Sequence, residues 1–207
     1  MEYEIRFYYP SKEYNKKLEQ LRKIKDLNYN GRKHEITSQF DHPNKEYSFY
    51  TKEVDGRFRI RKTEGQNDNK CMISWKRRLK EETIINKEEE VELSINHNEY
   101  DNLMFIINNV LHLKLIESYE RYRTVFQNED VEIVLDEYPF GLALEIEAKS
   151  KNKEPEEVID KYVKLLDLDY KDSYKLSWDD KYEELCKKQN KKKYNEVTFN
   201  KDMPCIK

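Results

Sequence analysis

Apolar and charged residues alternate along several short stretches of this chain. In Glu2-Tyr3-Glu4-Ile5-Arg6 every second residue is charged, and Leu144-Glu145-Ile146-Glu147 repeats the pattern near the other end. Successive side chains of a β-strand point to opposite faces of its sheet. Both stretches are therefore predicted to be strands with one charged face and one apolar face.

The same pattern predicts the order of elements along the whole chain. Residues 2–9 form the first predicted strand, and Asn30-Gly31 is a turn signal ahead of the second. Further strands are predicted at 33–40, 47–50, 57–62, 71–79, 88–95, 115–127, 131–136 and 142–148. Apolar residues at helical spacing predict helices over 12–24, 97–113 and 154–166, with a short helix within 173–186. No Pro-, Gly- or Ser-rich linker divides the chain, so we expect one α+β domain with helices outside the sheet or at its ends.

Composition sets broad limits on the class of protein. The chain has 207 residues, of which 39% are charged and 13% aromatic, and this aromatic share is unlike that of disordered chains. Its net charge of -3 indicates no particular partner. Cys71, Cys186 and Cys205 are scattered, with no C-x-x-C pair. We therefore expect free thiols in a reducing compartment, and a cytoplasmic protein that does not enter a membrane.

The charged strand faces allow two interpretations. In an open antiparallel sheet they would simply face water. In a closed sheet, with helices covering the apolar faces, they would line a cavity. Like charges recur at i and i+2, as in Arg59 and Arg61 or Glu145 and Glu147, and such pairs repel unless opposite charge lies between them. Carboxylates suit Mg²⁺ or Mn²⁺, and arginine rows suit phosphate oxygens, so the pattern favours a cavity that holds metal and anion together.

This ordered series of charged strands resembles the CYTH domains, or triphosphate tunnel metalloenzymes, and is most similar to their class IV adenylate cyclase-like branch. Glu2, Glu4 and Arg6 match the family's N-terminal E-x-E-x-K signature. The longest match joins residues 131–147 to the segment V-x-x-x-L-D-x-x-P-x-G-x-F-x-E-I-E. Shorter matches follow the family's order: 58–61 for L-R-x-R, 74–76 for T-x-K, Glu90 and Glu92 for R-x-E-x-E, 121–123 for K-x-R, and 178–185 with 197–199 for the closing elements.

The resemblance implies an eight-stranded antiparallel β-tunnel, a closed barrel with helices packed outside. The domain would span 1–207, with 187–207 a basic tail ending in a short strand. It implies binding of a triphosphate-containing small molecule (ATP, tripolyphosphate or thiamine triphosphate) with Mg²⁺ or Mn²⁺, no specific nucleic acid, and allows a homodimer. By position, Glu2, Glu4, Glu145 and Glu147 would hold metal, Glu90, Glu92 and Asp136 would assist metal or water, and Arg6, Arg59, Arg61, Lys76, Arg78, Arg121 and Arg123 would bind phosphate.

The reaction stays open at this point. Similarity to the cyclase branch favours ATP cyclisation, whereas the breadth of the family's activities favours hydrolysis of tripolyphosphate, thiamine triphosphate or a nucleotide. Arg6 stands where the family pattern has lysine, and a guanidinium binds phosphate but stays protonated and cannot act as a base. Arg6 therefore supports a second class, a catalytically weak sensor of triphosphates or nucleotides, or of RNA 5′-triphosphate ends. A purely structural α+β domain is the third.

Overall fold

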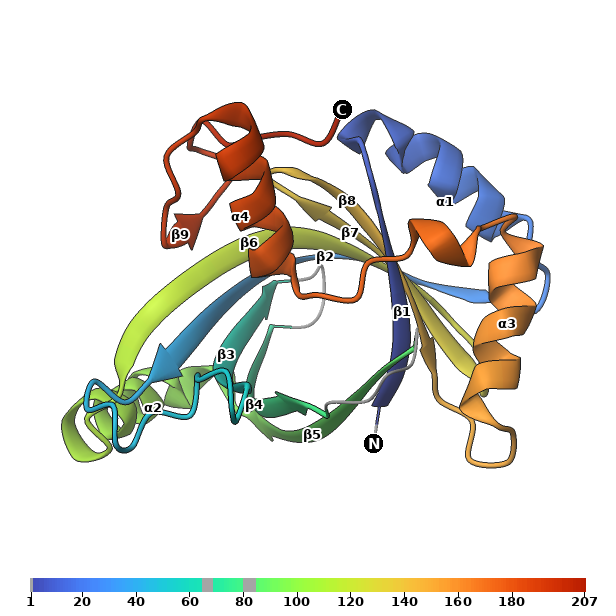
Figure 1. Ribbon diagram of the computed structural model, residues 1–207. Helices are drawn as coiled ribbons and strands as arrows, with labels where there is room; N and C mark the ends of the chain where they lie inside the picture. Colours follow the sequence, from blue (N-terminus) through green and yellow to red (C-terminus); the bar gives the residue numbers. More distant parts are fainter. Residues whose placement is uncertain (1, 65–68, 80–84) are drawn as a thin grey trace.

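Eight antiparallel strands close into a barrel in the computed structural model, which describes residues 2–64, 69–79 and 85–207 (Figure 1). The strand order is β2-β3-β4-β5-β1-β8-β7-β6, and β2 also pairs with β6, which closes the sheet. A short ninth strand pairs in parallel with β6. The strands are β1 (Glu2–Tyr9), β2 (Asn28–Asp41), β3 (Gly56–Glu64), β4 (Lys70–Arg78), β5 (Asn86–Ile95), β6 (Lys114–Gln127), β7 (Val131–Tyr138), β8 (Gly141–Ala148) and β9 (Glu196–Val197). The predicted single α+β domain with a closed barrel is confirmed.

The two longest strands, β2 and β6, make the closing contact. They pair from Asn28 opposite Gln127 to Asp41 opposite Lys114, with a register shift near Gly31. Gly31 has a positive φ of 94°, a conformation that glycine adopts without a steric penalty. The turn predicted at Asn30-Gly31 is therefore wrong: these residues form an irregularity within β2, of the kind that bends a strand and increases its twist.

Helices pack around the barrel and at one of its ends (Figure 1). They are α1 (Tyr14–Arg22), α2 (Tyr100–Phe105), α3 (Pro155–Leu165) and α4 (Trp178–Gln189), and short 3₁₀ turns occupy Ser11–Glu13, His97–Glu99 and Tyr170–Asp172. The single helix predicted over 97–113 is divided, because α2 continues into a π-helical segment, Ile106–Val110. A π turn holds more residues than an α turn and so rotates the apolar face. Ile107 is buried, whereas Val110 and Leu111 are 58% and 49% exposed.

Apolar side chains face outward from the barrel and pack under these helices. Ile5 and Phe7 of β1 join Leu144 of β8 and Ile159 of α3 in the largest buried cluster. On the other side, Phe40 and Ile60 pack with Ile107 below α2. Because the apolar faces point outward, the charged faces of the same strands point into the barrel, as the closed-sheet interpretation requires.

The C-terminal part of the chain packs at one end of the barrel. Ser177 and Asp180 form a capping box that starts α4, which favours a helix beginning at this position. Trp178 and Tyr182 of α4 pack with Tyr119 and Tyr138, which come from inward positions of β6 and β7. Residues 187–189 belong to α4, and Val197 of β9 is buried. In the part of the chain that the structure describes, no helix is both long and apolar enough to cross a membrane.

Residues 47–50, predicted to be a strand, lie instead in the connection between β2 and β3. Asp41, at the end of β2, holds this connection. Its carboxylate accepts hydrogen bonds from the Ser48 hydroxyl at 2.6 Å and the Phe49 amide at 3.0 Å. Side-chain acceptors thus satisfy backbone groups that a strand ladder would otherwise pair.

Gly56 lies where β3 passes very close to the Trp75 ring. A Cβ atom at position 56 would lie 2.2 Å from Trp75 Cη2 and 3.0 Å from the Phe49 carbonyl oxygen. We expect Gly56→Ala to lower the free energy of unfolding by about 1–3 kcal/mol through overpacking, a fall in Tm of about 5 °C. Thermal unfolding followed by circular dichroism measures it. Adding Trp75→Phe should recover part of the loss, and an unchanged Tm in Gly56→Ala alone would contradict this packing.

Candidate functional site

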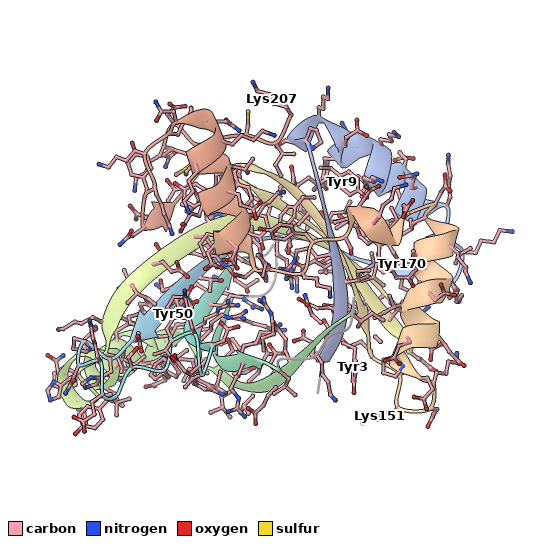
Figure 2. All side chains as sticks on the ribbon, viewed as in Figure 1. Tyr3, Tyr9, Tyr50, Lys151, Tyr170 and Lys207 are labelled. Atoms are coloured by element: carbon pink, nitrogen blue, oxygen red, sulfur yellow. The ribbon has the colours of Figure 1, made fainter. Side chains whose placement is uncertain are left out.

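The interior of the barrel holds a cavity walled almost entirely by charged side chains. Nitrogen and oxygen atoms gather in the space that the strands enclose (Figure 2). The lining residues are Glu2, Glu4, Arg6, Arg57, Arg59, Arg61, Lys76, Glu88, Glu90, Glu92, Tyr119, Arg121, Arg123, Glu132, Val134, Tyr138, Glu145, Glu147, Lys149, Ser177 and Trp178. All the predicted site residues are in this set except Arg78 and Asp136. These predicted charges therefore converge, although they come from six different strands.

Arg78 and Asp136 do not line the cavity but contact residues that do. Arg78 Nε is 3.5 Å from Glu88 Oε1. Asp136 is completely buried, and both of its oxygens accept hydrogen bonds from guanidiniums: Arg123 Nε at 2.7 Å, Arg123 Nη2 at 2.6 Å and Arg121 Nη1 at 2.8 Å. Asp136 thus holds two of the predicted phosphate-binding arginines in place.

Three arginines, Arg61, Arg121 and Arg123, form what we call the arginine wall. They surround Glu35 of β2, whose Oε2 accepts a hydrogen bond from Arg121 Nε at 2.9 Å. Arg61 Nε and Arg123 Nε lie 3.9 Å and 4.0 Å from the same oxygen. Burial alone would raise the pKa of Glu35, but the three guanidiniums outweigh it and hold that pKa well below its usual value. Glu35 is therefore ionised at neutral pH.

Lys76 of β4 is held by a second group of carboxylates. Its Nζ lies 2.5 Å from Glu2 Oε2, 3.0 Å from Glu88 Oε2 and 3.8 Å from Glu90 Oε1. Burial alone would raise the pKa of Glu88, but Lys76, Arg57 and Arg78 lower it well below the usual value. Glu88 thus anchors cations on the β4–β5 side, as Glu35 does on the β2–β6 side.

Three cavity carboxylates, Glu4, Glu147 and Glu132, lie side by side on neighbouring strands, and we call them the carboxylate row. Glu4 of β1 is directly opposite Glu147 of β8, which is directly opposite Glu132 of β7. Like charges in such positions destabilise a sheet. Burial raises the pKa of Glu4 to about 7 against the influence of Arg6. Burial, and next the Glu2 carboxylate, raise the pKa of Glu147 to about 9.

Glu145 differs from the carboxylate row because two guanidiniums neutralise it. Its Oε1 lies 2.5 Å from Arg6 Nε, and its Oε2 lies 3.3 Å from Arg123 Nη2. Burial alone would raise the pKa of Glu145, but Arg6 and Arg123 outweigh it and lower the value to about 2. Arg6 also binds Glu4 at 3.0 Å, so Arg6 lies between the carboxylate row and the arginine wall.

The donor chemistry of the carboxylate row fits a hard divalent cation. Over residues 2–64, 69–79 and 85–207, no three His, Cys, Asp or Glu side chains converge as a metal site. Glu4 is ion-paired with Arg6 and Glu147 with Lys149, yet three carboxylates directly opposite one another carry more negative than positive charge, and carboxylate oxygens are the ligands that Mg²⁺ and Mn²⁺ prefer. Glu4, Glu147 and Glu132 are the residues that could hold such an ion.

The arginine wall has donors without acceptors. Within the described part of the chain, Arg61 Nε and Arg121 Nη2 are buried and make no hydrogen bond. Arg121 Nη2 lies 2.7 Å from Glu35 Oε2, but not in the alignment of a hydrogen bond. Buried polar groups are normally paired. A buried donor without a hydrogen bond at Arg61, in a cavity lined by several arginines, therefore fits an anion with oxygen acceptors.

Sequence reasoning missed several residues of this site. The missed lining residues are Arg57, Glu88, Tyr119, Glu132, Val134, Tyr138, Lys149, Ser177 and Trp178, and the missed residue behind the wall is Glu35. Arg57 and Glu132 lie on the alternating faces already recognised and could have been included on that basis. Ser177 and Trp178 come from the start of α4, and no strand pattern points to them.

Comparisons with known proteins agree with this geometry. The model of the CYTH domain family matches residues 1–173. A search of curated proteins gives no match. Similar solved structures include PH1012 from Pyrococcus horikoshii OT3, 20% identical over 86% of this chain and 97% of that one, with a TM-score of 0.64. HpAC1 from Hippeastrum, described as having a dominant triphosphatase activity, is 19% identical over 95% and 100%, with a TM-score of 0.60. An adenylate cyclase candidate from Vibrio parahaemolyticus is 15% identical over 86% and 96%, with a TM-score of 0.63.

Proposed function

Because the chain belongs to the CYTH domain family, we propose that it is a divalent-metal-dependent triphosphatase that acts on a triphosphate inside the barrel. Proteins of this family bind triphosphate ligands and typically depend on a divalent metal. The observation that carries the proposal is that one cavity is lined both by arginines of the arginine wall, where Arg61 Nε makes no hydrogen bond, and by a row of opposed carboxylates. A metal–triphosphate complex would supply negative charge to the arginines and positive charge to the carboxylates.

The polar lining favours a substrate without a large apolar group. Tyr119, Tyr138 and Trp178 are at most 4% exposed and pack against one another, so their rings offer no open face to a nucleobase. We therefore propose inorganic tripolyphosphate as the preferred substrate. The dominant triphosphatase activity described for HpAC1 also favours hydrolysis over cyclisation.

In the proposed reaction, the arginine wall and Lys76 bind the phosphate oxygens and offset charge on the transferred phosphoryl group. Glu4, Glu147 and Glu132, with Glu2, would hold the divalent cation, which supplies charge neutralisation and orients the attacking water. Glu90 or Glu92 accepts one proton from the attacking water as the water oxygen bonds to the terminal phosphorus. The bond to the leaving diphosphate breaks, giving orthophosphate and diphosphate.

Incubation with tripolyphosphate, ATP and thiamine triphosphate, each with Mg²⁺ or Mn²⁺, tests the proposal. We expect orthophosphate and diphosphate from tripolyphosphate, no release without metal, and no cyclic AMP from ATP. Cyclic AMP with equimolar diphosphate would identify a cyclase instead. Tight binding of tripolyphosphate without turnover would instead identify a catalytically weak triphosphate sensor, the alternative that Arg6 supports.

A further inference from the structure

We propose that Glu35 is a positioning residue that fixes the orientation of the Arg121 guanidinium and thereby arranges the arginine wall for the transition state. This inference rests on the proposed function. Glu35 is 6% exposed and does not line the cavity, so it acts through the arginines in front of it. It lies on the inward face of β2, directly opposite Arg121 of β6 in the closing strand pair.

Arg121 is held along two edges. On one edge, Nε donates to Glu35 Oε2 at 2.9 Å. On the other, Nη1 donates to Asp136 Oδ2 at 2.8 Å and to the Tyr138 hydroxyl at 3.2 Å. Nη2 also lies 2.7 Å from Glu35 Oε2, so Glu35 faces the Nε–Nη2 edge. A guanidinium is planar, so carboxylate contacts on two of its edges fix the orientation of the whole group.

Glu35 also sets the charge of this wall. Arg61, Arg121 and Arg123 all approach its Oε2 within 4.0 Å, and Asp136 is the other carboxylate that binds Arg121 and Arg123. Glu145, which is shared with Arg6, is a third carboxylate in contact with Arg123. Without Glu35 the wall would gain one unit of net positive charge but lose the contact that orients Arg121. For an anion, the added positive charge favours binding, whereas the lost orientation of Arg121 disfavours it. We therefore expect substrate binding to be retained and stabilisation of the transition state to be lost.

Glu35→Gln separates these two effects, because glutamine has the shape of glutamate but no charge. We expect kcat for tripolyphosphate hydrolysis to fall about 10-fold and KM to change less than about 3-fold, the pattern for loss of an interaction that matters in the transition state. Glu35→Asp, which restores the charge, should recover part of kcat. The control is Glu89→Gln, which breaks an ion pair of 2.9 Å with Arg77 on the outer face of β5 and should leave both constants unchanged.

A purely structural role would lower activity only as far as it lowers the folded fraction, so each variant is compared at equal folded concentration by circular dichroism. Unchanged kcat in folded Glu35→Gln would overturn the proposal. Arg121→Lys gives a second test: it removes the two-edge contact, so adding Glu35→Gln to it should cost little more, whereas additive losses would overturn the coupling.

Calorimetric binding of tripolyphosphate separates this proposal from the proposed function. If the wild-type protein binds tripolyphosphate but does not hydrolyse it, the triphosphatase proposal fails. In that case crystal structures of the wild-type protein and Glu35→Gln decide: a changed orientation of the Arg121 guanidinium supports the positioning role, and an unchanged orientation overturns it. If the wild-type protein neither binds nor hydrolyses tripolyphosphate, both proposals fail.

Discussion

Asp136→Asn is expected to destabilise the protein by about 3 kcal/mol, a fall in Tm of about 10 °C for a chain of this size. Asp136 is completely buried, and its two oxygens accept three hydrogen bonds from Arg121 and Arg123. Asparagine keeps the volume of the side chain but removes its charge. Its amide nitrogen would replace a carboxylate oxygen and cannot accept a hydrogen bond from a guanidinium. Two buried guanidiniums then lose their shared counter-charge, which is the costly way to break a buried ion pair. Thermal unfolding without phosphate in the buffer measures the effect.

The matched control for this substitution is Asp160→Asn on α3. Asp160 pairs with Lys164 one helical turn away and is substantially exposed, so the same chemical change removes only a solvated pair. We expect a change below about 0.5 kcal/mol. If Asp136→Asn and Asp160→Asn shift Tm by similar small amounts, then Asp136 does not hold the arginine wall together.

Charge alternation made the inward faces of β1 and β8 predictable from sequence. Along these strands an apolar residue separates each pair of charges, so the period of two assigns every side chain to one face. The family resemblance then supplied the closed barrel. Where charges fall on both faces the same rule fails: in Lys87-Glu88-Glu89-Glu90, no alternation distinguishes the buried Glu88 from Glu89 on the outer face.

Glu35 shows a different limit of sequence reasoning. On β2, Glu35, Thr37, Gln39 and Asp41 alternate with less polar residues, but this face is mixed and carries no repeated charge. Its partner Arg121 is 86 residues away, and they meet only because β2 and β6 close the barrel. Local patterns can place a side chain on a face of a strand, whereas ion pairs across the closing strands depend on the register of the whole sheet.

Glu147→Gln is expected to raise the Tm of the metal-free protein and to abolish most of its response to Mn²⁺. The pKa of Glu147 is raised to about 9 from an ordinary value of 4.5, and that of Glu4 to about 7. Below about pH 4.5 both groups are neutral in the folded and unfolded chains, and neither costs stability. As pH rises the unfolded chain ionises first, so the metal-free wild-type protein should lose stability between about pH 4.5 and 9.

Glu147→Gln removes the upper part of the pH range over which the metal-free protein loses stability. In Glu147→Gln the decline should end near pH 7, where Glu4 titrates, and at pH 8 the metal-free variant should unfold about 3 °C above wild type, the shift for roughly 1 kcal/mol. Saturating Mn²⁺ should stabilise wild type by about 2–3 kcal/mol at 100 times its Kd, and the variant by much less. Glu89→Gln, on the outer face, should keep the wild-type profile.

The two halves of this prediction are linked by one physical cause. Glu147 is costly to ionise without metal because burial and the Glu2 carboxylate outweigh its ion pair with Lys149, and a divalent cation would relieve this shortage of positive charge. If Glu147→Gln stabilises the metal-free protein but keeps the full Mn²⁺ response, the charge shortage is real and the cation binds elsewhere. If Glu147→Gln loses the Mn²⁺ response without gaining stability, then Glu147 is a metal ligand whose ionised carboxylate does not destabilise the metal-free fold. Only both changes together assign the shortage and the metal to the same carboxylate row.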